Sequence, residues 1–433
     1  MFWDNEKGTL TTMQLHKRVT IEKVRQHLEW YERKTMRLDE ILTNLGIGRR
    51  RFYDLLRRYR ADDLANLKPV RTTNHLRLPK AIDEIIREEL VKDQQLINDP
   101  NTTIRTYNYQ AVCDEVVKRI GRDISAQTVR NRAKAWGFYL AKPSSKRKHV
   151  RVVMTTACGL LLQHDASHHV WAPHAGVKWS LITTLDDYSR LLLYAEFFEE
   201  ESSWAHIKAL EAVTTKYGIG ANYYTDNHAI FRFTERTETY RRTPKVDAKE
   251  VKTQWETAVR ASGMDIIYAL SPEAKGKIER PYRWLQDRIT RACAKSGITT
   301  IEQARRVLGE EVTRYNTHQV HSTTGEIPQV RFQRAEREGN SVFKPFELPA
   351  PYTSSKDVFC LREERKVNGY SQISWNKRYI KVPNYIPEGA TVELHIIPDS
   401  SRPEVRVWYK HELVQSVSYA PTNPTIPKGT NEQ

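Results

Sequence analysis

The sequence contains few cysteines and no long apolar segment. It has only four cysteines, Cys113, Cys158, Cys293 and Cys360, which lie far apart with no CxxC pair. This spacing argues against a disulfide framework or a cysteine zinc site and predicts reduced, partly buried thiols. No apolar run reaches about 18 residues, which argues against a transmembrane helix. The first residues lack a basic-then-apolar signal pattern, so we expect a cytoplasmic protein.

Negative charge is also in short supply. Lys and Arg number 69 against 53 Asp and Glu, giving a formal net charge of +16. A basic surface attracts polyanions, and nucleic acid is the commonest such partner. A membrane surface is the alternative, but no lipidation motif or basic amphipathic anchor supports it. We therefore expect a nucleic acid as the partner, and the motifs described below narrow this to double-stranded DNA and a nucleoid-associated location.

The length of 433 residues is too great for one ordinary core, and we expect a multidomain α/β protein. Helical periodicity dominates the first third, strands and helices alternate in the middle, and short strands fill the last part. The expected units are a first helix-turn-helix domain at 15–70, a second at 76–140, a basic linker at 141–154, a mixed α/β core at 155–335, a linker at 336–356, a small β-barrel at 357–418 and a disordered tail at 419–433.

The first helix-turn-helix pattern lies in "RLDEILTNLGIGRRRFYDLLRRYR". One helix is expected up to Leu45, a turn at Gly46–Gly48, and a second helix with Phe52 and Leu55 facing inward. The second helix is basic with a single acid, Asp54. The ordinary alternative is a basic helix that only faces solvent. Because the helix follows such a turn, we expect its basic side chains to contact DNA. The candidates are Arg49, Arg50, Arg51, Arg57 and Arg58.

A second pattern of this kind ends in "DISAQTVRNRAKAWGFY". Ser125 is a good N-cap for this helix, and Ile124 can pack back onto Val129. The exposed face carries residue types that suit base edges and phosphates. These candidates are Gln127, Arg130, Asn131 and Lys134, and the basic linker adds Lys146, Arg147 and Lys148.

Three acids stand at strand ends or helix starts of the expected α/β region. Asp165 follows the apolar run in "LLLQHDAS", Asp226 ends "NYYTD", and Glu279 begins the amphipathic part of "GKIERPYRWLQDRI". Three carboxylates from separate elements are what a pair of Mg²⁺ ions needs, because hard cations take oxygen ligands and bridge to phosphate. Basic side chains near these acids would then bind the phosphate groups of the DNA. They are Lys275, Lys277, Arg280 and Arg283.

Two glutamates compete for the third position in "SPEAKGKIER". Glu273 lies near the junction of loop and helix, where an acid favours the helix start. Six residues of helix turn through about 240°, so Glu273 cannot share the face of Glu279. We expect Glu279, next to the inward-facing Ile278, to be the ligand.

Other polar residues nearby have more ordinary explanations. Asp186 and Asp187 are expected in a structural hairpin turn, with a supporting role beside the site as the alternative. His164, His168 and His169 would form a zinc site only with further ligands at metal spacing, which the sequence does not offer. A supporting role or a DNA contact is the better alternative for these histidines.

The remaining candidates stay open or belong to the core. Trp171 and Trp179 are expected to be buried. Asn316, His318 and His321 lie in the turn-rich "YNTHQVHSTTGEIP", which is either a plain loop or a DNA contact. The residues alone do not decide between these two interpretations.

The ordered segments "HDAS…W", "LDDYSR", "YTDNHAIF" and "SPEAKGKIER…LQDR" resemble the DDE transposase and retroviral-type integrase catalytic core. With its helix-turn-helix units the chain is most similar to bacterial insertion-sequence transposases. The resemblance implies an RNase H-like catalytic core with Asp165, Asp226 and Glu279 as ligands of two Mg²⁺ (or Mn²⁺) ions. It implies cleavage of transposon ends, joining of 3′-hydroxyls to target DNA, and a homo-oligomer, dimer or higher. The final β-domain looks like the barrel that follows such cores.

Two departures from the family pattern are visible. Residues 227–278 separate the second and third acids, a longer interval than in retroviral enzymes, so 232–250 is expected to be an inserted loop. A His/Cys zinc-binding N-terminal domain is missing, which moves end recognition to the helix-turn-helix units. A DNA-binding regulator with an idle core and a nuclease that does not join DNA are the alternatives. The three acids argue against the first, while the second would use the same site.

Overall fold

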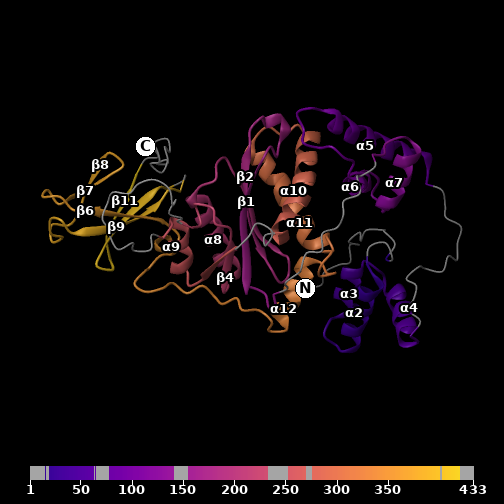
Figure 1. Ribbon diagram of the computed structural model, residues 1–433, viewed down its shortest axis with the longest axis horizontal. Coiled ribbons are helices and arrows are strands. Elements are labelled where there is room, and N and C mark those ends of the chain that lie inside the picture. Colours follow the sequence, from indigo (N-terminus) through magenta and orange to yellow (C-terminus); the bar gives the residue numbers. More distant parts are fainter. Residues whose placement is uncertain are drawn as a thin grey trace, which may run out of the picture.

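The computed structural model describes residues 19–62, 78–140, 155–232, 252–269, 276–399 and 402–419, with residues 15 and 64, and only the backbone over 276–280. These parts form an elongated molecule (Figure 1). Helical domains lie at one end, a mixed sheet with its helices in the middle, and a second set of strands at the other end. None of the described helices is both long enough and apolar enough to cross a membrane.

The first helical domain contains α2 (Ile21–Glu32), α3 (Leu38–Leu45) and α4 (Arg49–Arg60). Gly46 ends α3 with a φ of 57°, a left-handed conformation that glycine adopts at little cost. The chain then enters α4, whose Phe52 and Leu55 are fully buried. These are the two helices and the turn that the sequence predicts.

The second helical domain contains α5 (Lys80–Asn98), α6 (Tyr109–Ile120) and α7 (Ala126–Ala135). The predicted N-cap is confirmed, because Ser125 Oγ accepts a hydrogen bond of 3.1 Å from the Thr128 amide. Ile124 and Val129 are both buried in the apolar cluster of this domain, as expected.

The central sheet confirms the predicted mixed α/β core. Its strands are β1 (Leu161–His169), β2 (Trp179–Asp186), β3 (Leu192–Phe198), β4 (Asn222–Thr225) and β5 (Asp265–Tyr268), in the order β3-β2-β1-β4-β5. The first three are antiparallel, whereas β4 and β5 run parallel to β1. One expectation was wrong: Asp165 lies in the middle of β1, because β2 pairs with β1 as far as His169.

Helices cover both faces of this sheet. The helices α8 (Ser203–Tyr217) and α9 (Gln254–Ala261) pack on one face, and α10 (Gly276–Lys295) and α11 (Ile301–His318) pack on the other. A short 3₁₀ helix, η1 (Pro173–Ala175), follows β1, and α12 (Pro328–Arg337) follows α11. Trp171 and Trp179 are buried on the α10 side, which confirms their predicted place in the core.

The segment after α12 runs against the core. Single bridges join Ser341 to Cys158 and Lys344 to Ile219. Gly218 permits the second bridge, because a Cβ there would lie 2.2 Å from the Lys344 carbonyl oxygen. Part of the stretch expected to be a linker therefore acts as a strap on the core. All four cysteines are free and buried.

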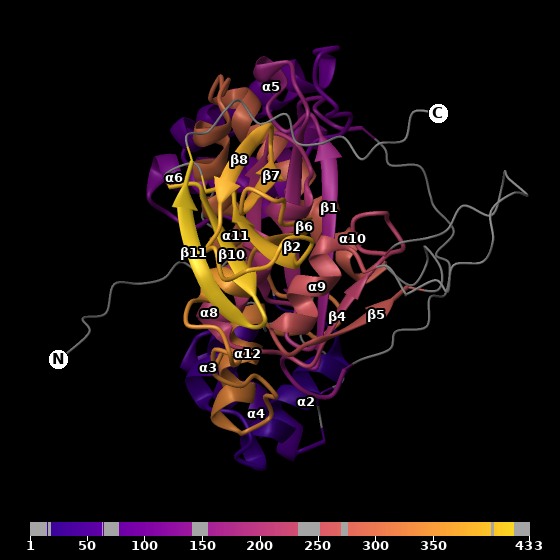
Figure 2. The same cartoon turned by 90° about the vertical axis from the view of Figure 1, so that its left-hand side faces the viewer.

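The C-terminal strands form two sheets (Figure 2). After η3 (Ser355–Asp357), the strands β6 (Leu361–Lys366), β9 (Thr391–Ile397), β10 (Glu404–Tyr409) and β11 (Glu412–Ser418) make a sheet in the order β11-β10-β9-β6, while β7 (Gln372–Trp375) and β8 (Arg378–Lys381) form a hairpin. These pairings do not close into a ring within the described residues, so the closed barrel stays a prediction.

A buried cluster of polar and charged side chains links η3 to strands β9 and β10 of the C-terminal sheet. Asp357 is fully buried and accepts hydrogen bonds from Trp408 Nε1 at 2.9 Å and from Arg406. His395 Nδ1 lies 3.0 Å from Asp357 Oδ1. Burial lowers the pKa of His395, but its hydrogen bonds, that to Asp357 first, outweigh burial and raise the pKa to about 10.

We predict that this cluster stabilises the C-terminal sheet less at alkaline pH than at neutral pH. Because the folded pKa of His395 exceeds the ordinary value, its stabilisation is full below about pH 6.5 and declines as pH rises towards 10. The free energy of unfolding should therefore fall less between pH 7 and 10 in His395→Gln than in the unaltered chain. Urea titrations at several pH values measure this, and parallel pH profiles would contradict it.

Candidate active site

The parallel pairing of β1 with β4 brings two of the predicted acids together. Leu161, Leu162 and Gln163 pair with Asn222, Tyr223 and Tyr224. The same register continued by two residues places Asp165 beside Asp226. Asp226 directly follows β4, so the alternation of side chains, continued by one residue past Thr225, puts both carboxylates on the α10 face, on strands about 4.8 Å apart; both charges act on Tyr282.

Close backbone contact at Gly220 helps to set this register. A Cβ at Gly220 would lie 2.8 Å from the Gly159 carbonyl oxygen, closer than side chains tolerate. The same oxygen accepts a 2.8 Å hydrogen bond from the Ala221 amide, directly before β4. The glycine therefore lets β4 start against β1 at the position that the pairing of Asp165 and Asp226 requires.

The turn that carries Asp226 is held by its own side chains. The His228 amide donates to Asp226 Oδ1 at 2.9 Å, which is an Asx turn. Asn227 Nδ2 donates to the Ala269 carbonyl at 3.0 Å, and Arg232 donates to Asn227 Oδ1 at 3.1 Å. These bonds attach the turn to the end of β5, so Asp226 is placed by two neighbouring strands.

Helix α10 lies over the face that carries Asp165. Thr183, the cross-strand neighbour of Asp165, donates a 2.8 Å hydrogen bond to the Tyr282 hydroxyl. Gln286 Nε2 donates to Ser167 Oγ at 3.2 Å. Burial and then the charge of Asp165, with a smaller effect of Asp226, raise the pKa of Tyr282 well above its ordinary value. Tyr282 therefore stays a neutral phenol beside both acids.

The third predicted acid belongs to the first turns of α10. The helix starts at Gly276, so the backbone of Glu279 is helical and lies one turn before Tyr282. The side chains of Glu279, Lys277 and Arg280 fall outside the described part, as do Glu273 and Lys275 altogether. Arg283, the remaining basic candidate here, is exposed on α10.

The described acids suit a hard metal ion but do not complete a site by themselves. Within the described side chains, no group of three His, Cys, Asp or Glu residues could hold a metal ion. That set does not include Glu279. Asp165 and Asp226 supply the oxygen donors that Mg²⁺ or Mn²⁺ prefers, and their negative charges act on the same buried phenol. The donor set therefore fits a divalent cation if α10 adds a third carboxylate.

Asp186 and Asp187 form the structural turn that was predicted. Both are fully buried. Asp186 accepts hydrogen bonds from the amides of Gly159 at 2.9 Å and Ser189 at 2.7 Å. Asp187 pairs with the buried Arg190 at 2.7 Å. Their carboxylates brace the hairpin between β2 and β3 and the start of β1.

A chain of histidines occupies the opposite face of β1. His164 Nδ1 lies 2.9 Å from Thr184 Oγ1, and its Nε2 lies 2.8 Å from His206 Nδ1 on α8. His206 and His168 both bind the carboxylate of Glu201, at 2.9 and 2.6 Å. Burial opposes it, but hydrogen bonds from these two histidines lower the pKa of Glu201 to about 2. These partners give no support to a zinc site.

The sequence carries no signal for this chain of histidines, because His206 belongs to α8 and Glu201 lies just before that helix, both far from β1 in the sequence. His169 differs from the other two histidines: it points to the α10 side, where its Nε2 lies 3.2 Å from Thr103 Oγ1. The alternation of side chains thus separates histidines that look like one cluster in the sequence.

We predict that His206 is required for stability. Replacing it by leucine leaves Glu201 and His164 without their shared partner in a buried setting. The free energy of unfolding of His206→Leu should fall by about 2 kcal/mol or more. His174→Leu is the matched control, since exposed His174 makes a single bond to the Ala294 carbonyl, and its loss should stay below about 1 kcal/mol. Equal losses in chemical denaturation would contradict the assignment.

The stretch that the sequence marks as turn-rich begins within the last turn of α11, and its residues make structural contacts. Asn316 binds the amide and carbonyl of Leu192 at 3.0 Å each, so it joins α11 to β3. His321 is buried, and its Nδ1 accepts a hydrogen bond from the Thr323 amide. His318 Nδ1 lies 2.6 Å from the neighbouring Thr317 hydroxyl. Of these three residues only His321 lies in a loop, because Asn316 and His318 belong to the last turn of α11.

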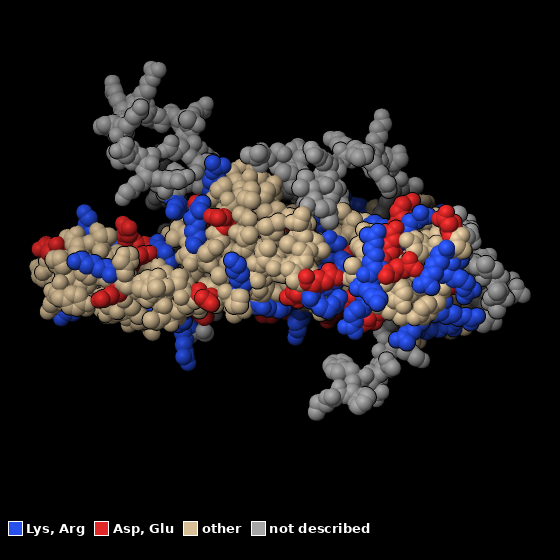
Figure 3. Space-filling view, turned by 90° about the horizontal axis from the view of Figure 1, so that it is seen from below, with Lys and Arg blue, Asp and Glu red and all other residues tan. Residues whose placement is uncertain are grey.

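The candidate DNA-binding residues lie on two exposed helix faces. On α4, Arg49, Arg50 and Arg57 are exposed, while Arg51 pairs with Asp54 at 2.7 Å and Arg58 is half-buried. On α7, Gln127 binds Asn131 at 2.8 Å, and Arg130 and Lys134 flank the ring of Tyr139. The linker candidates Lys146, Arg147 and Lys148 are outside the described residues. Basic side chains gather over the helical end of the molecule, interspersed with acids (Figure 3).

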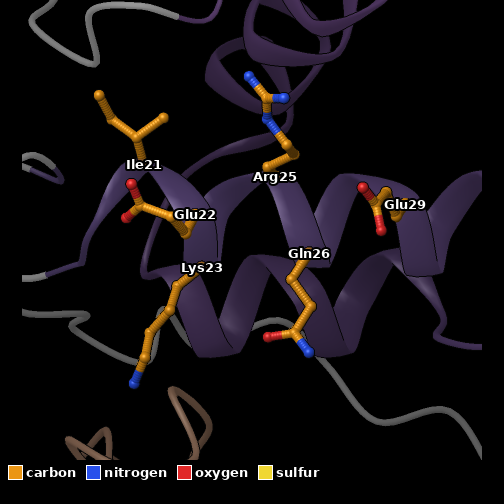
Figure 4. Close-up of a pocket in the computed structure, with 6 residues that line it drawn as sticks. All are labelled: Ile21, Glu22, Lys23, Arg25, Gln26 and Glu29. Atoms are coloured by element: carbon orange, nitrogen blue, oxygen red, sulfur yellow. The ribbon is translucent and has the colours of Figure 1, made fainter.

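A surface hollow along α2 lies apart from these residues. Figure 4 shows its lining, which comes from Ile21, Glu22, Lys23, Arg25, Gln26 and Glu29 along one side of the helix. Lys23 uses its ammonium group to bind the Ser322 carbonyl at 2.5 Å. All six lining residues belong to α2, one of them also contacts the core, and none comes from the sheet that carries the acids.

Sequence comparison finds transposases. The chain is 28% identical over 299 residues to y4bF, a proposed transposase of Sinorhizobium fredii, covering 68% of this chain and 60% of that protein. It is 28% identical over 158 residues to the transposase for insertion sequence IS1202 of Streptococcus pneumoniae, covering 36% of this chain and 32% of that one. The chain is a relative of transposases. The predicted resemblance is confirmed, although the chain spans less than two thirds of each relative.

Other comparisons add little. No protein-family profile matches the chain. Among solved structures, a simian T-cell lymphotropic virus intasome bound to PP2A regulatory subunit B56γ aligns at 12% identity and a TM-score of 0.33, covering 72% of this chain and 96% of that one. The HTLV-2 integrase catalytic core in complex with magnesium aligns at 14% identity and 0.30, covering 42% and 99%. Both TM-scores are too low to establish a shared fold.

Proposed function

We propose that this transposase relative binds transposon-end DNA, cleaves it, and joins the 3′-hydroxyl ends to target DNA. The observation that carries the proposal is the juxtaposition of Asp165 and Asp226 on neighbouring parallel strands beneath the helix that contains Glu279. The proposed core is RNase H-like, and the proposed location is cytoplasmic and nucleoid-associated. Cleavage and joining at two ends call for a homo-oligomer, dimer or higher.

Asp165, Asp226 and Glu279 would hold two Mg²⁺ ions, or Mn²⁺. Two such ions, when bound, activate the attacking oxygen and stabilise the leaving oxygen of an in-line displacement at phosphorus. The chain's own contribution is position: β1 and β4 fix two carboxylates, and the Asx turn fixes the orientation of Asp226. Tyr282, which is buried and bonded to Thr183, would keep water away from the sheet side of the site.

The basic residues would bind the DNA backbone around this site. Lys275, Lys277, Arg280 and Arg283 precede or belong to α10, so they would contact phosphates next to the reacting group. The faces of α4 and α7 would dock on the transposon end, where Arg and Lys bind phosphates and Gln127 and Asn131 suit base edges. Lys146, Arg147 and Lys148 would add charge between the two regions.

We predict that each of the three acids is essential. Asp165→Asn, Asp226→Asn and Glu279→Gln should each lower Mg²⁺-dependent strand joining by about 1,000-fold or more, because every carboxylate stabilises charge that develops in the transition state. End binding in the presence of a chelator should be nearly unchanged. Joining of labelled DNA ends to a plasmid measures the first, and gel shift measures the second.

Glu273→Gln is the matched control, since it removes the same charge six residues earlier and should retain joining. Activity retained in one of the three variants removes that residue from the site. Hydrolysis of the ends without a joined product would indicate a nuclease, and binding without either reaction would indicate a regulator.

We predict that α4 contacts phosphates. Arg49→Gln with Arg50→Gln should weaken end binding and reduce the slope of log affinity against log salt by up to about 2, because each phosphate contact contributes about 0.9. Arg25→Gln with Arg33→Gln removes two exposed arginines from the same domain at α2 and its end, and should leave the slope unchanged. Equal slopes for the two double variants would exclude α4 from the DNA contact.

A further inference from the structure

Within the described residues, the second helical domain contacts the core through charged and polar side chains, while its apolar cluster is separate. Its own apolar cluster contains no residue of the core, and the cluster around α10 contains no residue of the domain. The ion pairs between the described parts of the two are Arg291 with Asp93, Arg288 and Arg314 with Asp114, and Lys295 with Glu89 and, at 3.8 Å, with Asp93. Pairs of this kind need a defined geometry to offset their desolvation, so they fix orientation more than they add stability.

Arg291 on α10 is the centre of this contact. It is 2% exposed, and its Nη1 donates to Asp93 Oδ2 at 2.7 Å, where Asp93 is fully buried. Its Nη2 donates to the Thr106 carbonyl of the same domain. Its Nε and Nη2 also donate to Asp287 Oδ1 at 3.1 and 3.0 Å. A planar guanidinium bound on three sides holds the domain and α10 in one relative position.

The same domain also reaches the strand that carries the first acid. Thr103, in the loop between α5 and α6, lies 3.2 Å from His169 at the end of β1. The Asn108 side chain, from the end of that loop, binds Asp287 on α10. The loop therefore contacts both the acid-bearing strand and the helix that lies over it.

Helix α10 connects this contact to the acids. From Arg291 towards its start, it binds Ser167 through Gln286 and Thr183 through Tyr282. Pro281 then lacks the amide that would bind the carbonyl of Lys277, so the turn with Glu279 has one backbone bond fewer to the rest of the helix. The position of that turn depends on how the later part of α10 is held.

We propose that Arg291 is a positioning residue, which uses the second helical domain as a clamp that sets α10, and with it Glu279, over Asp165 and Asp226. This inference rests on the proposed function for its catalytic consequence, while its structural part stands separately. The domain would then have two roles: it reads the transposon end and it completes the geometry of the site.

The test uses the full-length chain with Arg291→Met and with the double variant Asp93→Leu/Arg291→Met. The double variant leaves neither partner of the pair buried without the other, which guards against simple unfolding. Both should lower the joining rate at saturating end DNA by about tenfold or more, because small misplacements of a reacting group are costly. Affinity for the same DNA in chelator should change less than about threefold. Amide hydrogen exchange over 276–286, without DNA or metal, should be faster.

Arg305→Met is the matched control. Arg305 lies on α11 and binds only within the core, to Glu196 and the Phe197 carbonyl, so joining rate and exchange should both match the unaltered chain. The proposal is overturned if exchange and saturating rate in the Arg291 variants equal those of Arg305→Met. Faster exchange in a chain that joins no DNA would uphold the clamp and reject the proposed function.

Discussion

The parallel pairing of β1 with β4 is the constraint on which the site depends. A slip of one residue would turn Asp226 to the opposite face of the sheet, away from Asp165 and towards the histidines. Three features oppose such a slip: close backbone contact at Gly220, burial of Tyr223 in the core, and the bonds that tie Asn227 to the end of β5. The spacing of the two acids therefore depends on the sheet register and on the turn that directly follows β4.

Adjacent residues of β1 divide two tasks between the two faces. Asp165 faces α10 and the candidate site, while His164 faces α8 and is bound through His206 to Glu201. The histidine chain links β1 to α8 on this face, and its hydrogen bonds stabilise the negative charge of Glu201. On the other face, α10 is bound both by the sheet and by the second helical domain. The position of this helix therefore depends in part on contacts made far from the two acids.

The sequence could predict the elements but not the contacts between distant ones. Periodicity located the strands around Asp165 and Asp226 and the helix of Glu279, and turn chemistry located Gly46 and the cap at Ser125. The same patterns placed Asp165 wrongly at the end of a strand, because no local feature of the sequence shows how far along β1 the pairing with β2 extends. Arg291 with Asp93 was not predictable, because a buried ion pair between domains leaves no periodic signal in either segment.

The strap after α12 has a consequence for dividing the chain. Ser341 and Lys344 add backbone bridges to the core, and Val358 and Phe359 lie within its apolar cluster. A fragment cut at the end of α12 would lose these contacts and leave Cys158 and Tyr217 exposed to water. A fragment that keeps the central sheet intact has to run past Phe359, so the core and the C-terminal sheet share boundary residues, and separating them would destabilise both.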